Sequence, residues 1–256
     1  MKSRVLGFSL IIIGILIFLV ACFALFPYFW MDPYYHVIYS LKKDDGNNTI
    51  NNIVSQTQNY NNSPVRLTKI ASLITQNFSD SWWSYQWEER FCTYQNSSAP
   101  YGWCSPYYGT PLYKIYNENI GYPYLITKLG NVTSYISNDL SVSPEWIAYQ
   151  KGGNCQAISI LFNETVNRSG FVSRVVRSKG YNHVWNEIEI NGSWKVFDIQ
   201  RFGYSNGSDI IDSNYWNVDP KDYSKSIGQA NFSVYTFNLT DVGFGENITP
   251  SYFPVS

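Results

Sequence analysis

The dipeptide Asn191-Gly192 separates two runs that alternate in polarity, His183–Ile190 and Ser193–Ile199. Asn-Gly between alternating runs is among the strongest short signals for a β-hairpin with a two-residue turn. Such a turn sets Ile190 opposite Ser193, and this pairing fixes the register of the whole hairpin. The sequence therefore predicts two antiparallel strands in a defined register.

In this register Asp198 lies opposite Trp185, and His183 and Asp198 are diagonal neighbours on one face of the hairpin. Diagonal neighbours have backbones about 7–8 Å apart, so a carboxylate can reach an imidazole nitrogen. We expect Trp185, Glu187 and Val196 on the same face. The other face is expected to carry Ile188, Ile190 and Phe197.

A cysteine stands at the start of the helix that precedes these strands. Apolar residues recur at i, i+3, i+4 and i+8, the spacing of a helix face, at Ile158, Leu161, Phe162 and Val166. We predict a helix that opens at Asn154-Cys155 and closes at Gly170. The sequons at Asn163 and Asn167 fall on the other faces of this helix, which we expect to be exposed to solvent.

The residues ahead of Cys155 predict a second helix. Ser143-Pro144-Glu145 is typical of a helix start, with Ser as N-cap, Pro at the first position and an acid in the first turn. That helix is expected to end at Gly152-Gly153, where the absence of side chains lets a substrate backbone approach the thiol. Residues 112–150 as a whole look mainly helical.

Cys155, His183 and Asp198 together supply a nucleophile, a base and an orienting acid. Partial positive charge at a helix N-terminus stabilises a thiolate, and the unpaired amides there can donate to an oxyanion. An adjacent His forms a thiolate–imidazolium pair, which an Asp stabilises. The chain has two histidines, and His36 lies close to the apolar N-terminal stretch, so a Cys–His mechanism in the domain must use His183. The alternative is an inert buried thiol with His and Asp hydrogen-bonded in a sheet.

Charge and composition exclude several classes of function. The net charge of −1 and the lack of a basic face argue against nucleic-acid binding. With two histidines there is no His-rich zinc site, and no acidic cluster resembles a calcium loop. We therefore predict neither a metal nor a cofactor.

The N-terminus predicts a membrane anchor. Val5–Phe26 is uncharged and mostly apolar, and as a helix it spans roughly 33 Å, which matches a bilayer core. Tyr28, Phe29 and Trp30 follow it as an interfacial belt, and the basic residues ahead of it favour an N-terminus inside and a domain outside. Two alternatives remain: a lipoprotein signal at Leu19-Val20-Ala21-Cys22, and a cleaved secretory signal, for which the apolar run is too long.

Sequons and cysteines agree with an external location. An Asn- and Ser-rich chain makes some Asn-x-Ser/Thr sites by chance, about 4 here given 25 Asn, but 12 are present. Such an excess favours a glycosylated surface protein. The sites are Asn47, Asn61, Asn77, Asn96, Asn131, Asn163, Asn167, Asn191, Asn206, Asn231, Asn238 and Asn247. Cys92 and Cys104 are close enough in sequence to form a disulfide, which leaves Cys155 as the lone thiol of the domain.

These features divide the chain into an anchor (residues 1–30), a polar, Asn-rich stalk (residues 31–65) and a folded domain (residues 66–256, with its core at 143–200). Beyond Gln200 we expect loops and short strands at Ser233–Phe237 and Ser251–Val255. A helix core beside antiparallel strands makes the domain α+β.

These residues and their spacing resemble the motifs of the transglutaminase-like superfamily, whose members are relatives of papain. The shared elements are a Gly-x-Cys helix start, a Gly-x-x-x-Arg strand, a His-x-Trp-x-Glu strand and a Trp-x-x-x-Asp strand. They correspond here to Gly153-Asn154-Cys155, Gly170 to Arg174, His183 to Glu187 and Trp194 to Asp198. The match covers about 50 residues. In the calcium-dependent animal enzymes of this superfamily, a Trp upstream of the nucleophile helps to hold the oxyanion. We cannot align a counterpart of this Trp in the present sequence.

The resemblance implies an α+β papain-like core, in which a nucleophile helix packs on an antiparallel sheet, and a Cys155–His183–Asp198 triad. Arg174, Trp185, Glu187 and Trp194 are implied as structural members of the signature. It also implies a cysteine-dependent peptidase, amidase or protein-glutamine transamidase, acting on a surface protein or a peptide of a wall polymer. The alternative is a non-catalytic surface module for binding or adhesion. The oligomeric state, the substrate, and whether water or an amine accepts the acyl group stay open.

Overall fold

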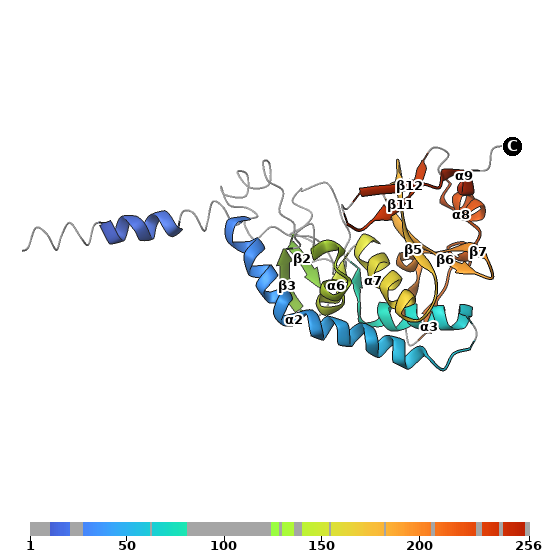
Figure 1. Ribbon diagram of the computed structural model, residues 1–256, viewed down its shortest axis with the longest axis horizontal. Coiled ribbons are helices and arrows are strands. Elements are labelled where there is room, and N and C mark those ends of the chain that lie inside the picture. The colour runs from blue at the N-terminus through green and yellow to red at the C-terminus, as the bar shows by residue number, and fades with distance from the viewer. Residues whose placement is uncertain are drawn as a thin grey trace, which may run out of the picture.

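The computed structural model describes residues 11–20, 28–61, 63–80, 124–127, 130–135, 140–153, 155–181, 183–205, 208–228, 232–240 and 243–253 (Figure 1). The domain is α+β, as the sequence predicts. Its centre is a six-stranded antiparallel sheet of order β10-β7-β6-β5-β11-β12. The strands are β5 (Ser173–Lys179), β6 (Val184–Ile190), β7 (Ser193–Phe197), β10 (Trp216–Val218), β11 (Ser233–Asn238) and β12 (Gly243–Asn247).

Helices cover both faces of this sheet (Figure 1). The helices are α2 (Tyr28–Thr57), α3 (Ser63–Asn77), α6 (Pro144–Gln150), α7 (Cys155–Arg168), α8 (Pro220–Ile227) and α9 (Thr249–Tyr252), with short 3-10 turns η2 (Leu140–Val142) and η3 (Ile199–Arg201). Small paired strands complete the described elements: β1 (Ser79–Asp80) with β4 (Gly152–Gly153), β2 (Tyr124–Thr127) with β3 (Gly130–Tyr135), and β8 (Gly203–Ser205) with β9 (Ser208–Ile210).

The hairpin has the predicted register. The strands β6 and β7 pair from Ile190 opposite Ser193 to Asn186 opposite Phe197. Asn191 and Gly192 both have positive φ, as a type I′ turn requires. The two faces divide as predicted: Trp185 and Val196 belong to one buried cluster, while Ile188 and Phe197 belong to the other.

Those two clusters form two cores, one on each side of the sheet. The first lies between the sheet and α2, α3, α6 and α7, and includes Ile70, Leu161 and Phe162. The second lies under α8 and α9, and includes Tyr223 and Tyr252. Because both faces are covered, β6 is buried along most of its length instead of being half exposed.

The predicted helix starts are largely confirmed. Ser143 is the N-cap of α6, and its hydroxyl accepts a hydrogen bond from the amide of Trp146 at 3.3 Å. The helix ends sooner than predicted, at Gln150, because Lys151 adopts a left-handed conformation with φ 55°. The next helix, α7, begins at Cys155 and is closed by Gly170 with φ 88°.

The polar faces of α7 are less exposed to solvent than predicted. Asn163 is only 8% exposed, and its side-chain oxygen accepts a hydrogen bond from the hydroxyl of Ser173 at 2.9 Å. The prediction is wrong here because β5 covers this side of the helix. Asn167 is exposed as predicted.

Two further local predictions are wrong. Within 112–150 the described residues include the hairpin β2–β3, whose strands contain β-branched residues, as well as the helix α6. Near the C-terminus, Ser251 lies in the helix α9, and not in a strand. The predicted strand at Ser233–Phe237 is present as β11.

Residues 31–65 differ from the expected polar stalk. Most of this stretch is α2, which packs on α6, α7 and α3. The residues that face the domain recur at helical spacing and are buried: Gly46, Ile50, Ile53 and Thr57. The asparagines between them made the segment look like a linker, although it is a helix docked on the domain.

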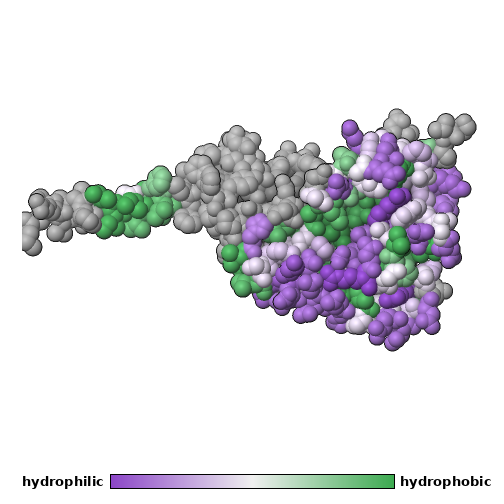
Figure 2. All heavy atoms as spheres, in the orientation of Figure 1, coloured by the Kyte–Doolittle hydropathy of each residue, from purple (hydrophilic) through white to green (hydrophobic). Residues whose placement is uncertain are grey.

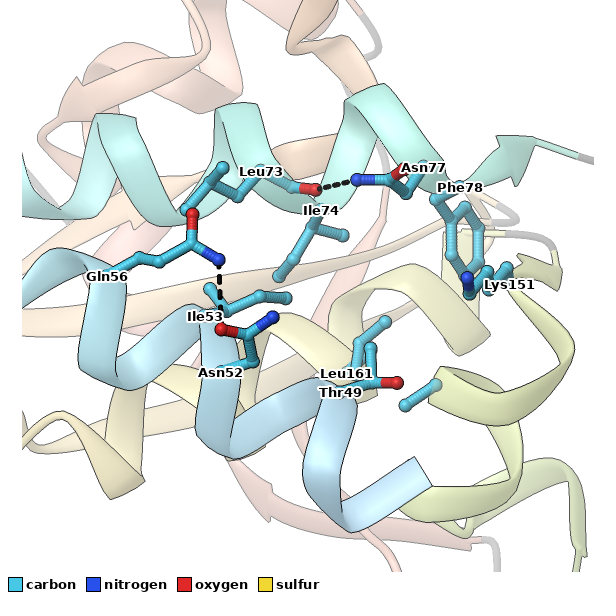
Figure 3. Close-up of a pocket in the computed structure, with 11 residues that line it drawn as sticks. Thr49, Asn52, Ile53, Gln56, Leu73, Ile74, Asn77, Phe78, Lys151 and Leu161 are labelled. Carbon is cyan, nitrogen blue, oxygen red and sulfur yellow. Dashed lines mark hydrogen bonds between the residues drawn. The ribbon is translucent and has the colours of Figure 1, made fainter. Parts of the chain in front are cut away.

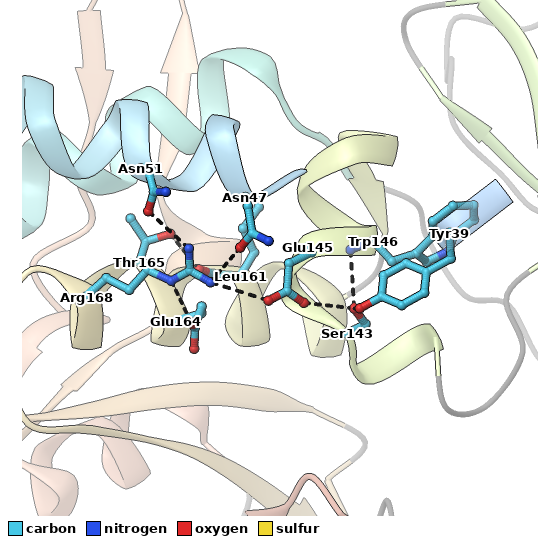
Figure 4. Close-up of polar contacts among 10 residues, drawn as sticks. All are labelled: Tyr39, Asn47, Asn51, Ser143, Glu145, Trp146, Leu161, Glu164, Thr165 and Arg168. Carbon is cyan, nitrogen blue, oxygen red and sulfur yellow. Dashed lines mark hydrogen bonds and ion pairs between the residues drawn. The ribbon is translucent and has the colours of Figure 1, made fainter. Parts of the chain in front are cut away.

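Arg168 joins α2 to the rest of the domain (Figure 4). Its guanidinium donates to the side-chain oxygens of Asn47 at 3.0 Å and Asn51 at 3.1 Å, both on α2. It also forms ion pairs with Glu145 at 3.3 Å and Glu164 at 2.7 Å. One side chain at the end of α7 therefore holds α2 and α6 together.

The predicted anchor lies mostly outside the described residues. Residues 11–20 are helical, and each of them except Gly14 carries an exposed, large apolar side chain (Figure 2). Within the described ranges no helix combines the length and hydrophobicity needed to cross a bilayer. Cys22 and the proposed Cys92–Cys104 disulfide also fall outside these ranges.

Candidate active site

Cys155 is the first residue of α7, and it is a half-buried free thiol. It follows Gly152–Gly153, which pair in parallel with Ser79–Asp80. As the first residue of a helix, it lies among amides that have no acceptor within the helix. The backbone thus provides hydrogen-bond donors next to the thiol.

Two buried hydrogen bonds fix α7 on β6. The hydroxyl of Ser159 donates to the carbonyl of Val184 at 3.1 Å, and the side-chain amide of Asn186 donates to the carbonyl of Ser159 at 2.9 Å. Both lie on the face of β6 that belongs to the first core. They set the position of the helix that carries Cys155 relative to the strand that follows His183.

His183 lies immediately before β6 and is 6% exposed. Its carbonyl accepts hydrogen bonds from the amide and the hydroxyl of Ser178, both at 3.1 Å, and its amide donates to the carbonyl of Tyr181. The ring lies 5.5 Å from that of Tyr181 and 5.8 Å from that of Trp185, between centroids. Main-chain bonds and two aromatic neighbours therefore hold the imidazole in place.

His183 and Asp198 are in direct contact. The imidazole Nε2 lies 2.8 Å from Oδ2 of Asp198, which is 1% exposed. Nε2 donates to the carboxylate, which leaves Nδ1 to face another partner. The predicted contact between the two side chains is confirmed. The strand ladder stops at Phe197, so Asp198 does not pair with Trp185, and its amide donates to the carbonyl of Tyr215.

His183 also interacts with Cys155. Burial disfavours the imidazolium, but the charge and hydrogen bond of Asp198, followed by those of Cys155, outweigh burial and raise the pKa of His183 from 6.5 to about 10. These neighbours therefore favour the cationic form of the imidazole. The structure brings together all three residues that the sequence singled out.

A hydrogen-bond network lies beside this site, in the second core. The indole of Trp185 donates to the hydroxyl of Tyr252 at 2.8 Å, and that hydroxyl donates to Oε1 of Glu187 at 2.5 Å. Arg174 contacts Oε2 of the fully buried Glu187 at 2.6 Å, and its guanidinium lies 4.1 Å from the ring centroid of Trp194. The signature residues outside the triad thus form one connected group, in which Trp185 and Glu187 are fully buried and Arg174 and Trp194 are half-buried.

Sequence reasoning missed two tyrosines near the site. The hydroxyl of Tyr223, on α8, donates to Oδ2 of Asp198 at 2.8 Å. Tyr252, on α9, joins Trp185 to Glu187 as described above. Both come from segments with no motif, and no local pattern in the chain of 22 tyrosines distinguishes them.

A separate cavity of about 260 Å³ opens between α2, α3 and α6 (Figure 3). Its lining contains both apolar and polar side chains. Its lining is Thr49, Asn52, Ile53, Gln56, Leu73, Ile74, Asn77, Phe78, Ala148, Lys151 and Leu161. None of the three site residues borders this cavity.

Among the described residues, no group of three His, Cys, Asp or Glu side chains is placed to hold a metal ion. The chemistry that the site can perform with its own groups is that of a thiol, a cationic imidazole and a buried carboxylate.

Comparisons with known proteins yield only a weak structural similarity. No family model matches the chain, and no curated protein matches its sequence. Among solved structures, it is similar to one described as "Crystal structure of a TGase", with a TM-score of 0.38 and 12% identity. The similarity covers 72% of this chain and 41% of the other, so this chain spans less than half the length of that protein.

Proposed function

We propose that this chain is a thiol enzyme with a transglutaminase-like core that acts on amide bonds through an acyl-enzyme on Cys155. The observation that carries the proposal is the contact of His183 with both Cys155 and Asp198. Each residue has an ordinary structural role elsewhere in proteins. A free thiol at a helix start that shares one buried histidine with a carboxylate fits nucleophilic catalysis.

The reaction has two stages. The thiolate of Cys155 attacks the carbonyl carbon of the amide, and the oxygen takes the negative charge, which amides at the start of α7 stabilise. The imidazolium of His183 gives its proton to the leaving nitrogen, the C–N bond breaks, and a thioester remains. Water or a primary amine then attacks the thioester, His183 takes the proton of the attacking group, and the thiolate leaves.

Alkylation of the thiol tests the site. We expect iodoacetamide to modify Cys155 rapidly at neutral pH in the native protein, because His183 lies in contact with the thiol and can act as its base. His183→Gln should slow the reaction at least about 10-fold at the same pH. The matched control is His36→Gln, which changes the other histidine. Equal rates in all three proteins would sink the proposal.

Product analysis distinguishes the two acceptors. A glutamine-containing peptide is incubated with the enzyme with and without a labelled primary amine, and the products are weighed by mass spectrometry. A transamidase yields the amine adduct, whereas a hydrolase yields the free acid or two shorter peptides even when amine is present. Cys155→Ser should yield none of these products.

We further propose that residues 5–26 anchor the enzyme in a membrane with the domain outside, where surface proteins or peptides of wall polymers are the substrates. The uninterrupted apolar surface of residues 11–20 supports this location. Fractionation of cells that express the full chain and a variant without residues 1–30 tests it. If the full chain were recovered in the soluble fraction, as the variant without residues 1–30 is expected to be, the anchor would be refuted.

A further inference from the structure

The carboxylate of Asp198 receives two donors on one oxygen. Both Nε2 of His183 and the hydroxyl of Tyr223 lie 2.8 Å from Oδ2. Within the described part of the chain, the other oxygen, Oδ1, is buried without a hydrogen-bond partner. The histidine and the tyrosine therefore compete for the charge of the same atom.

Tyr223 is held rigidly in this position. Its ring is fully buried and lies 5.1 Å from that of Trp185, 5.9 Å from that of Tyr215 and 6.4 Å from that of Tyr252, between centroids. Lys195, on β7, forms an ion pair at 3.0 Å with Asp219, the residue before α8. The helix that carries Tyr223 is thus tied to the strand that leads into Asp198.

The phenol can only act as a donor here. Burial, and then the neighbouring Asp198, raise the pKa of Tyr223 well above its ordinary value, so the hydroxyl keeps its proton throughout the working range. A protonated phenol beside a carboxylate donates to it. The interaction is therefore present whenever Asp198 is ionised.

We propose that Tyr223 is a positioning residue for the triad: it fixes the carboxylate of Asp198 and draws charge from the oxygen that faces His183. This inference rests on the proposed function. A carboxylate that kept its full charge on Oδ2 would bind the imidazolium more tightly. The imidazolium would then be a weaker acid toward the leaving nitrogen, because proton transfer is most efficient when the acid is not held too strongly.

Four other ionisable groups surround the His183–Asp198 pair. Cys155 approaches from α7, and the ring of Tyr181 packs on that of His183. Arg201, on η3, interacts with Asp198 by charge and donates to the hydroxyl of Tyr181 at 3.2 Å, and Tyr215 interacts with Arg201. The Tyr223→Phe change leaves all four in place, so a shift that it causes reports the lost hydroxyl.

The test is the titration of the imidazole of His183, followed by NMR in protein labelled with ¹⁵N-histidine. The chain has two histidines, so His183→Gln assigns the signals. In Tyr223→Phe we expect the titration of His183 to move to higher pH. The control is Tyr215→Phe, whose hydroxyl donates to the carbonyl of Ser226 and not to Asp198, and in which no shift is expected.

Kinetics provides a second readout. With a peptide substrate, Tyr223→Phe should lower kcat about 10-fold while KM stays unchanged, because substrate contacts are not altered. A titration of His183 that is the same in Tyr223→Phe as in the wild type would overturn the inference, whatever the activity. If the titration of His183 moves to higher pH in Tyr223→Phe but the wild-type protein has no activity, the result would support the inference and count against the proposed function.

A second variant keeps the inference testable if the phenylalanine variant does not fold. Incorporation of 3-fluorotyrosine at position 223 retains the ring and the hydroxyl but makes the phenol a stronger donor. We expect the titration of His183 to move to lower pH in this protein. A shift to higher pH, or none, would contradict the inference.

Discussion

Gly46 of α2 lies directly against the carbonyl of Glu145 at the start of α6. A Cβ at position 46 would lie 1.9 Å from that oxygen, far inside van der Waals contact. The obstacle is main chain, which cannot turn aside as a side chain can. The two helices therefore approach as closely as they do only because residue 46 has no side chain.

Gly46→Ala should consequently destabilise the domain, by about 1–3 kcal/mol, the usual cost of forcing a methyl group into a packed interface. At an exposed helix position the same change would be favourable by roughly 1 kcal/mol, because Ala is the better helix former. Urea unfolding of Gly46→Ala and of the wild type measures this loss of stability. Asn48→Ala, at an exposed position of α2, is the control, and it should be neutral or slightly stabilising.

A substitution at Lys151 is expected to have the opposite effect and to stabilise the domain. It caps α6 with φ 55°, a left-handed conformation that costs a residue with a side chain about 1–2 kcal/mol. Lys151→Gly should therefore stabilise the domain by about 1 kcal/mol in thermal unfolding. Asn191→Gly, at φ 52° in the hairpin turn, should change stability less, because Asn tolerates this conformation. A glycine at 151 that gives no gain would show that the lysine side chain offsets the strain.

Arg174 compensates a fully buried carboxylate, that of Glu187. Arg174→Met should cost about 3–5 kcal/mol, because it leaves that charge with the hydroxyl of Tyr252 as its one side-chain partner among the described residues. Adding Glu187→Gln removes the uncompensated charge, and the double variant should recover part of the loss. If the double variant is no more stable than the single one, the ion pair is not the cause.

The pair of His183 and Asp198 predicts how stability depends on pH. The pKa of His183 is raised to about 10 in the folded protein from 6.5, so the folded state binds the proton more tightly. This contribution is fully present below pH 6.5 and is lost as the pH rises through about 10. Urea midpoints measured across this range should fall with pH in the wild type and fall less in His183→Gln. Parallel curves for the two proteins would contradict the raised pKa.

Local signals in the sequence were enough to predict the contact between His183 and Asp198. The turn at Asn191-Gly192 and the helix at Cys155 depend on neighbouring residues, and these fix where His183 and Asp198 lie on a hairpin. A two-residue turn leaves no freedom in the register, so the contact across the strands followed from it.

The remaining parts depend on contacts between distant segments. The stripe of Gly46, Ile50, Ile53 and Thr57 has helical spacing, but its burial required α6 and α7 to be present. The bond from Tyr223 to Asp198 joins residues 25 positions apart. Asn163 illustrates the reverse error, because a polar residue on the outer face of an isolated helix becomes buried once β5 packs there.

The hairpin also determines the order in which the site can assemble during folding. His183 and Asp198 are only 15 residues apart, and a β-hairpin closes in about 1–10 μs, so base and acid can meet before any distant contact forms. Cys155 joins them only when α7 docks on the finished sheet. A chain that is still folding therefore lacks the contact between Cys155 and His183, which forms only in the native structure.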